Sequence, residues 1–159
     1  MNKFKITILI ILLVLILFLS TSYKVVELRL DETELLTLIN NARAEKNLQP
    51  LAIDSNLERI AQERSNDMIT RGYFSHYTPE GRRVRYGETI SLGLINIDKK
   101  WVNQNVNVTV LCDSKYELNS LLSSYTHRTV IMDRIYKKVG IGVAYNNENV
   151  IITILFSSR

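Results

Sequence analysis

Residues 139–156, with the sequence VGIGVAY, NNEN and VIITILF, form the stretch that decides the fold. Two apolar segments rich in β-branched residues, 139–145 and 150–156, flank four residues that include three asparagines. Strand-forming segments on either side of an Asn-rich turn are typical of a β-hairpin. The sequence therefore predicts a hairpin over these residues.

Helical patterns precede the hairpin. Asp31, with Glu34 three residues later, predicts the start of one helix, because an acidic cap and an acidic third residue satisfy free backbone amides. Ser55 and Glu58 predict the start of a second helix in the same way, and Gly72 is expected to cap its end. Apolar residues recur at helical spacing after both starts.

Between the second helix and the hairpin the pattern changes several times. Residues 73–86 are expected to form a loop. Over residues 101–111 apolar and polar side chains alternate, which is typical of a half-buried strand. Trp101, at the start of this strand, is expected to lie in the core. A third helix is expected over residues 113–124, with His127 at its end. Helices first, strands mostly last and no βαβ alternation predict an α+β fold with helices packed on an antiparallel sheet.

The first residues have the pattern of an export signal. Residues 1–22 begin with Lys3 and Lys5, continue as an apolar run and end in the small residues Ser20 and Ser22. This is the order of a signal peptide, and the run is also just long enough to serve as an uncleaved signal anchor. The position of the two lysines predicts that the rest of the chain lies outside the cytoplasm.

The chain is accordingly divided into residues 1–22 as signal peptide or anchor, 23–30 as linker and 31–159 as one domain. The protein is expected to be exported, and either secreted or tethered to the membrane. Membrane contact would then come only through residues 1–22, if they are not cleaved.

Charge and cysteine content narrow the class of protein. Without the two leader lysines, 18 basic residues face 16 acidic ones, which leaves +2 and does not indicate a nucleic-acid partner. Arg82, Arg83 and Arg85 are expected to be surface residues. Cys112 is the only cysteine and is expected to be a small buried side chain. No intramolecular disulfide can form, so stability must come from packing.

Six segments carry a resemblance, in order and spacing. They are residues 38–43 with 48–51 (LINNAR, LQPL), 57–68, 73–81 (YFSH followed by P and G), 87–90 (GETI), 124–128 (SYTHR) and 139–143 (VGIGV). Together they resemble the CAP superfamily, in the bacterial form of its SCP domain. The resemblance implies a three-layer α-β-α sandwich with a central antiparallel sheet. It also implies a cleft that contains His76, Glu88 and His127.

These three residues suggest a metal site. Two neutral imidazoles and a carboxylate could hold a divalent ion such as Zn²⁺ and leave positions open for water. Without the resemblance, the structural interpretation of each histidine, as a hydrogen-bonded residue, is favoured, since no HExxH or paired-cysteine pattern is present. The resemblance brings the two interpretations level. Both interpretations stay open at this stage.

Glu88 has alternative interpretations of its own. A tight turn at Gly87 would aim its carboxylate into the cleft. The carboxylate could also be a charge at a helix N-terminus or form an ion pair with Arg85 or Arg82. Glu117 lies near the place where relatives carry a second cleft glutamate, but the sequence does not align it there.

Aromatic residues gather in the expected loop. Tyr73, Phe74, Tyr77 and Tyr86 could line a groove for an apolar or peptide ligand, or could pack against the sheet. Both interpretations are carried forward.

Three functions are consistent with the sequence. The first is a non-catalytic, extracytoplasmic binding or interaction module for an unidentified small-molecule, lipid or protein ligand. The second is a metal-assisted, peptidase-like hydrolase in which Glu88 activates water. The third is an inert domain, in which Thr89 in place of asparagine and Leu121 in place of tryptophan mark a lost function. Ser75 and Ser124 lack a GxSxG elbow and are expected to make only loop or cap hydrogen bonds.

Overall fold

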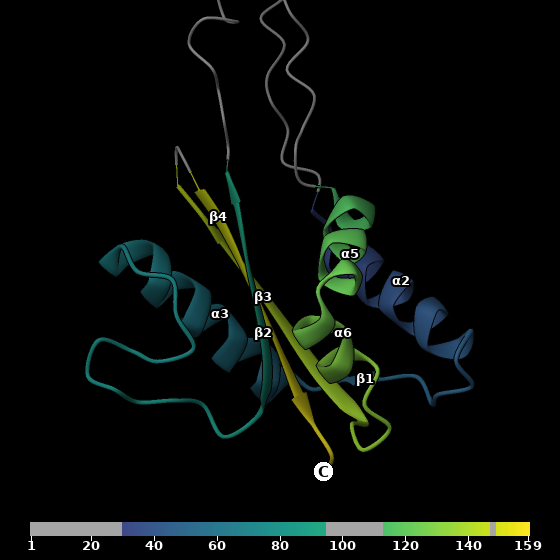
Figure 1. The fold of residues 1–159 in the computed structure, drawn as a ribbon. Helices are drawn as coiled ribbons and strands as arrows, with labels where there is room; N and C mark the ends of the chain where they lie inside the picture. Colours follow the sequence, from purple (N-terminus) through teal and green to yellow (C-terminus); the bar gives the residue numbers. More distant parts are fainter. Residues whose placement is uncertain (1–29, 95–112, 147–148) are drawn as a thin grey trace, which may run out of the picture.

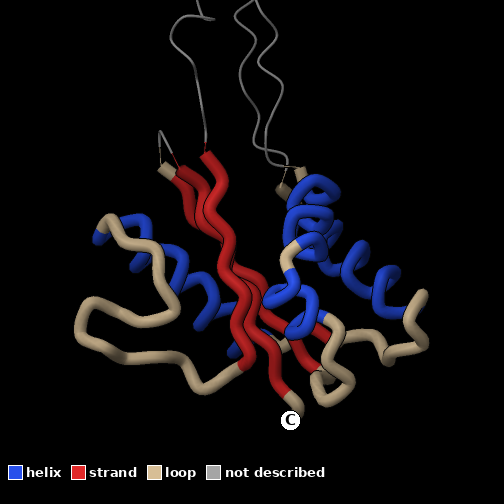
Figure 2. The backbone as a smooth tube through the Cα atoms, in the orientation of Figure 1, coloured by secondary structure: helices blue, strands red, loops and turns tan. Residues whose placement is uncertain are grey.

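A four-stranded sheet forms the centre of the computed structural model, which describes residues 30–94, 113–146 and 149–159 (Figures 1 and 2). The strands are β1 (Ala52–Ile53), β2 (Gly87–Leu94), β3 (Lys138–Tyr145) and β4 (Asn149–Ser157), in the order β1-β3-β4-β2. Pairing is antiparallel except between the short β1 and β3, which run parallel. Strand β2 therefore lies at one edge of the described sheet.

Helices cover both faces of this sheet. Helix α3 (Ser55–Arg71) lies on one face, and α2 (Glu32–Ala44), α5 (Ser114–Ser123) and α6 (Tyr125–Ile131) lie on the other (Figure 1). The arrangement is the predicted α+β, three-layer α-β-α sandwich. Its sheet is antiparallel apart from the two residues of β1.

The predicted hairpin is confirmed, and its second arm is the central strand. Strand β4 pairs with β3 on one side and with β2 on the other, and residues Val150 to Phe156 are all buried. Because side chains alternate along a strand, a run that is apolar at almost every position suits a strand covered on both faces. The continuous run VIITILF thus fits the middle of a sandwich.

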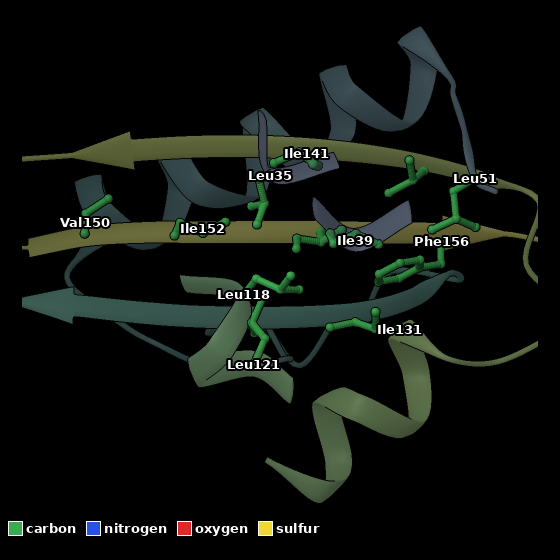
Figure 3. Close-up of a cluster of buried hydrophobic side chains, with 12 residues drawn as sticks. Leu35, Ile39, Leu51, Leu118, Leu121, Ile131, Ile141, Val150, Ile152 and Phe156 are labelled. Atoms are coloured by element: carbon green, nitrogen blue, oxygen red, sulfur yellow. The ribbon is translucent and has the colours of Figure 1, made fainter. Parts of the chain in front are cut away.

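The larger core lies between the sheet and helices α2, α5 and α6 (Figure 3). Its members are Leu35, Ile39, Leu51, Leu118, Leu121, Ile131, Val139, Ile141, Val150, Ile152, Ile154 and Phe156. On the other face, smaller clusters around Leu57 and Met68 pack α3 against β4 and β2. Both helical layers are therefore held to the sheet by burial of apolar side chains.

Helix α3 sits directly on the backbone of β3. A Cβ added at Gly140 would lie 2.2 Å from the backbone nitrogen of Glu58, and one added at Gly142 would lie 2.2 Å from that of Gln62. Since alternate residues of a strand face one side, the two glycines leave room for the helix, while Ile141 between them enters the main core. The GIGV sequence is thus a contact surface for α3.

The helix caps agree with the predictions at two of three places. Asp31 accepts a hydrogen bond from the Glu34 amide at 2.9 Å, and Gly72 ends α3 in the left-handed conformation with φ 67°. The expected cap at Ser55 is wrong. Asp54 is the N-cap of α3, and its carboxylate accepts from the amides of Asn56 and Leu57. Asp54 and Ser55 can both cap the N-terminus of α3. Asp54 is favoured because its carboxylate also interacts favourably with the helix dipole.

Two residues of the LINNAR segment tie α2 to the connection that follows it. The Asn40 side chain pairs with the backbone of Leu51, donating to its carbonyl at 3.0 Å and accepting from its amide at 2.8 Å. Arg43 is fully buried, and its guanidinium donates to four backbone carbonyls. This part of the resemblance to relatives therefore serves the fold.

The elements β1, β2 and α6 were not predicted, and several predictions lie outside the described residues. Strand β1 and helix α6 are too short to show a periodic pattern. The leader, Trp101, Cys112 and the strand expected over 101–111 fall among residues that the structure does not describe. Within residues 30–94, 113–146 and 149–159, no helix is long and apolar enough to cross a membrane.

Candidate functional site

His76 lies in the predicted loop between α3 and β2. The loop folds back on itself, with the Thr78 amide donating to the Arg82 carbonyl at 2.8 Å and Gly81 in the left-handed region at φ 78°. Just before this turn, the hydroxyl of Ser75 accepts from the amide of Tyr77 at 3.1 Å. These local bonds place the imidazole of His76 beside the edge strand β2.

Glu88 is the partner of His76. It is the second residue of β2, its side chain is fully buried, and its Oε2 lies 2.7 Å from Nδ1 of His76. Its other oxygen, Oε1, accepts from Nε of Arg64 at 3.2 Å. Both carboxylate oxygens are therefore committed to neighbouring side chains.

The expected surroundings of Glu88 are corrected in two respects. Gly87 begins a strand instead of making a tight turn, and the ion pair is formed with Arg64 of α3, not with Arg85 or Arg82. Strand alternation, which turns Glu88 toward α3, is the cause. A signal was present in the sequence, because Arg64 shares the apolar face of its helix, and a buried arginine requires a partner.

His127 lies within helix α6, whereas it was expected at the end of the preceding helix. Ser124 ends α5 and precedes α6, so the chain bends there and continues as a helix through His127. Burial lowers the pKa of His127, and the nearby charge of His76 lowers that pKa further. Both effects favour the neutral imidazole, the form that binds metal ions.

The structure thus brings His76 and Glu88 into direct contact and places His127 within electrostatic reach of His76. Among the residues that the structure describes, neither Nε2 of His76 nor the ring of His127 makes a hydrogen bond, and both residues are partly exposed.

The structure gives Glu88 a different role from that of a third metal ligand. The described parts of the chain hold no group of three or more His, Cys, Asp or Glu side chains placed around a common point. Glu88 instead lies behind His76, with its Oε2 2.7 Å from Nδ1 of the imidazole, in the position that carboxylates take behind metal-binding histidines.

The two departures from the family pattern are buried. Thr89 is 1% exposed, and its hydroxyl has no hydrogen-bond partner among the described residues. Leu121 is 1% exposed and belongs to the main core. Leu121 therefore takes part in packing, and neither side chain has appreciable exposure to solvent.

Glu117, which the sequence did not place, is buried on α5. It is 3% exposed, one carboxylate oxygen lacks a partner among the described residues, and the Ser91 hydroxyl bonds to the carboxyl group. Burial raises the pKa of Glu117. A carboxylate held in this way destabilises the folded state once it ionises.

Glu117→Gln is expected to raise the free energy of unfolding by about 1 kcal/mol at pH 7, because an amide removes a buried charge. The folded state holds the Glu117 proton more tightly than the unfolded state does. Stability of the unaltered chain therefore falls as the pH rises from the ordinary value of 4.5 toward the raised pKa. Urea unfolding at several pH values measures the difference, which should vanish at low pH.

The exposed Glu63→Gln serves as the control for this prediction, since Glu63 only pairs with Arg59 on the helix surface. A loss of stability at neutral pH in Glu117→Gln, relative to that control, would contradict the expectation.

The two serines show no nucleophile geometry. Ser75 accepts from a loop amide, as described, and the Ser124 hydroxyl pairs with that of Thr126 at 3.0 Å. Within the described residues, neither hydroxyl bonds to His76 or His127. Ser75 makes the loop hydrogen bond that was expected of it. Ser124 occupies a cap position but makes no side-chain cap bond.

The aromatic residues divide between the two predicted roles. Tyr73 and Tyr86 are partly buried against the α3 clusters, whereas Phe74 and Tyr77 are exposed. Phe74 joins Tyr73 and Leu92 in the wall of a cavity of about 200 Å³ at the end of α3. A larger cavity of about 580 Å³ opens beside the first turn of α3. Neither cavity is lined by His76, Glu88 or His127.

The fold and the residues at the edge strand β2 define the class of protein. It is an α-β-α sandwich with two partly exposed histidines and a buried glutamate. A family model, described as CAP, the cysteine-rich secretory protein family, matches residues 36–156. The chain belongs to the CAP family, in the bacterial SCP-domain form that the motifs predicted. Although the family description names a cysteine-rich protein, the sequence here has one cysteine.

Individual relatives support the assignment at low identity. Uncharacterized protein YkwD of Bacillus subtilis (strain 168) is 26% identical over 112 residues, which cover 70% of this chain and 41% of YkwD. The chain thus spans less than half the length of this curated relative.

Two solved structures share the fold. An outer surface protein of Borrelia burgdorferi aligns with a TM-score of 0.59 and 15% identity, covering 80% of this chain and 92% of the Borrelia protein. An extracellular SCP-domain protein of Bacillus anthracis str. Ames aligns with a TM-score of 0.51 and 20% identity, covering 79% of this chain and 40% of that protein. At these identities the likeness concerns the fold.

Proposed function

We propose that the protein is a non-catalytic, extracytoplasmic binding module whose cleft at His76, Glu88 and His127 can take up a divalent metal ion. The observation that carries the proposal is the pairing of His76 Nδ1 with the buried Glu88, beside a second histidine that favours the neutral form. The physiological ligand would be a small molecule, a lipid or a protein that reaches this cleft.

Placement outside the cytoplasm is supported from two directions. Residues 1–22 have the composition of an export signal. The two structural relatives are described as an outer surface protein and an extracellular protein. Either secretion or membrane tethering agrees with these observations, and the mass of the exported protein distinguishes them.

Binding without turnover is supported by the contacts that Glu88 already makes through both carboxylate oxygens. A general base must accept a proton from water, yet both oxygens of Glu88 already accept hydrogen bonds from Arg64 and His76. The arrangement suits a residue that holds an imidazole in place. No observation on the described residues favours the hydrolase alternative over the binding module.

Metal titration tests the proposal directly. The full chain, purified in mild detergent, is titrated with Zn²⁺ and Co²⁺ near neutral pH, with heat release and the Co²⁺ absorption spectrum as readouts. We expect His76→Ala and His127→Ala each to weaken binding at least about tenfold, because each removes a ligand and the loss of a ligand exceeds the effect of losing its outer partner.

Glu63→Gln is the matched control and should bind like the unaltered chain. Failure of the unaltered chain to bind either ion would end the metal proposal. Turnover of peptide or ester substrates that is lost in Glu88→Gln would favour the hydrolase instead.

A further inference from the structure

We propose that Arg64 is a positioning residue of this cleft: it fixes Glu88 and the His76 loop so that Nδ1 of His76 faces the carboxylate and Nε2 faces the ligand. The inference rests on the proposed function, because it concerns the same cleft. It adds a residue that has no part in ligand contact and assigns separate tasks to the two nitrogens of His76.

Three donors of Arg64 reach three different parts of the chain. Nε donates to Glu88 on β2 at 3.2 Å, one terminal nitrogen donates to the Tyr73 hydroxyl at 2.7 Å, and the other donates to the Ser75 carbonyl at 2.7 Å. Arg64 is only 7% exposed. Because guanidinium is planar and rigid, these three bonds fix the loop relative to helix α3 and strand β2.

The Ser75 bond acts on the residue next to His76. With the Ser75 carbonyl held by Arg64, the backbone that carries His76 cannot rotate freely. The position of His76 is thus set by a rigid helix, although the residue lies on a loop. Sites held by regular elements are more precise than sites on loops alone.

The Glu88 bond sets the tautomer of His76. An ionised carboxylate only accepts hydrogen bonds, so Nδ1 of a neutral His76 must carry the hydrogen, and Nε2 must carry the lone pair. The His76 side chain is 41% exposed, and its Nε2 has no partner among the described residues. Arg64 holds the carboxylate that imposes this choice, and it compensates the buried charge.

A second layer of contacts holds Arg64 itself. The Tyr73 hydroxyl, which accepts from Arg64, donates to Asp67. Asp67 accepts from Arg71, which also pairs with the exposed Glu80 in the loop turn. The Tyr73 ring lies between the Arg64 and Arg71 guanidinium groups, at 5.9 and 5.7 Å. The chain of contacts therefore ties the start of the loop and its turn to α3.

Nitrogen NMR of the histidine rings tests the proposal without any ligand. The full chain is labelled with ¹⁵N-histidine and measured at a pH where the imidazoles are neutral. In the unaltered chain we expect His76 to be mainly the Nδ1–H tautomer. In Arg64→Lys, which keeps the charge but offers one nitrogen in place of three, we expect a mixture of tautomers. Zn²⁺ affinity should fall about tenfold, as for other outer-shell substitutions.

Two further variants keep the test decisive. Arg59→Gln, on the exposed face of the same helix, should leave the His76 signals unchanged. Tyr73→Phe removes one acceptor of Arg64 and should shift the tautomer partway, which gives a readout even if Arg64→Lys does not fold.

The outcomes separate the two proposals. A His76 that is Nε2–H in the unaltered chain, or one that stays fully Nδ1–H in folded Arg64→Lys or Tyr73→Phe, would overturn the role of Arg64. A tautomer change without Zn²⁺ binding in any variant would support the role of Arg64 and count against the metal proposal alone.

Discussion

Replacing Gly142 with alanine is expected to destabilise the domain by at least about 3 kcal/mol, the upper range for overpacking a core. The added Cβ would lie 2.2 Å from the backbone nitrogen of Gln62 and 2.3 Å from the carbonyl carbon of Ala61. Backbone atoms of a helix cannot move aside individually, so the whole of α3 would have to withdraw from β3.

Withdrawal of α3 would also break its polar contacts with β3. Ser65 donates to the Gly142 carbonyl at 2.9 Å, and the Gln62 side chain pairs with the backbone of Val143. Gly140→Ala would meet Glu58 and Leu57 in the same way. Since whole-domain stabilities are about 5–15 kcal/mol, the double variant is expected not to fold.

Thermal and urea unfolding followed by circular dichroism measure these effects. Gly72→Ala is the control, because a Cβ at Gly72 meets no atom within 4 Å and the cost comes only from its positive φ. That cost is about 1 kcal/mol. A Gly142→Ala variant as stable as Gly72→Ala would contradict the close contact of α3 and β3.

Arg43→Ala is expected to cost about 4 kcal/mol of stability, in the range observed when one partner of a buried polar network is removed. Nε donates to the carbonyl of Gln49 at 3.0 Å, and the terminal nitrogens donate to those of Ile131, Asp133 and Tyr136 at 2.6, 3.1 and 3.3 Å. Without the guanidinium, buried carbonyls lose their donor and a cavity remains.

Arg43→Lys should recover only a minor part of this loss. A single ammonium cannot reach four carbonyls on separate segments, and burial, which already lowers the pKa of Arg43, would favour a neutral lysine. Denaturant midpoints of both variants provide the measurement, and Arg59→Ala, an exposed arginine, is the control. Stability of Arg43→Lys equal to that of the unaltered chain would show that charge alone matters there.

The sequence predicted those parts of the fold that depend on nearby residues. Asp31 and Gly72 mark helix ends through their own chemistry, and the hairpin follows from two strand-forming arms around an Asn-rich turn. Helix α6 was not predicted because seven residues carry too few turns to show a helical period. His127 was therefore placed one element too early.

The sequence predicted which residues form the candidate site. It did not predict which side chains they contact. His76 and Glu88 do meet, but the sequence offered Arg82 and Arg85 as partners because they are near in the chain. Arg64 is distant in sequence and reaches Glu88 only after α3 packs on the sheet. Contacts of this kind depend on tertiary structure, which local patterns do not encode.

Strand β4 has a consequence for the order of folding. It is the last described element along the chain, yet it joins β3 to β2 and contacts the helices of both layers. The sheet cannot be completed before this strand has been synthesised, and pairing with β2 closes a long loop, which slows folding. For a chain proposed to cross a membrane, slow completion of the sheet would lengthen the time available for translocation before the domain folds.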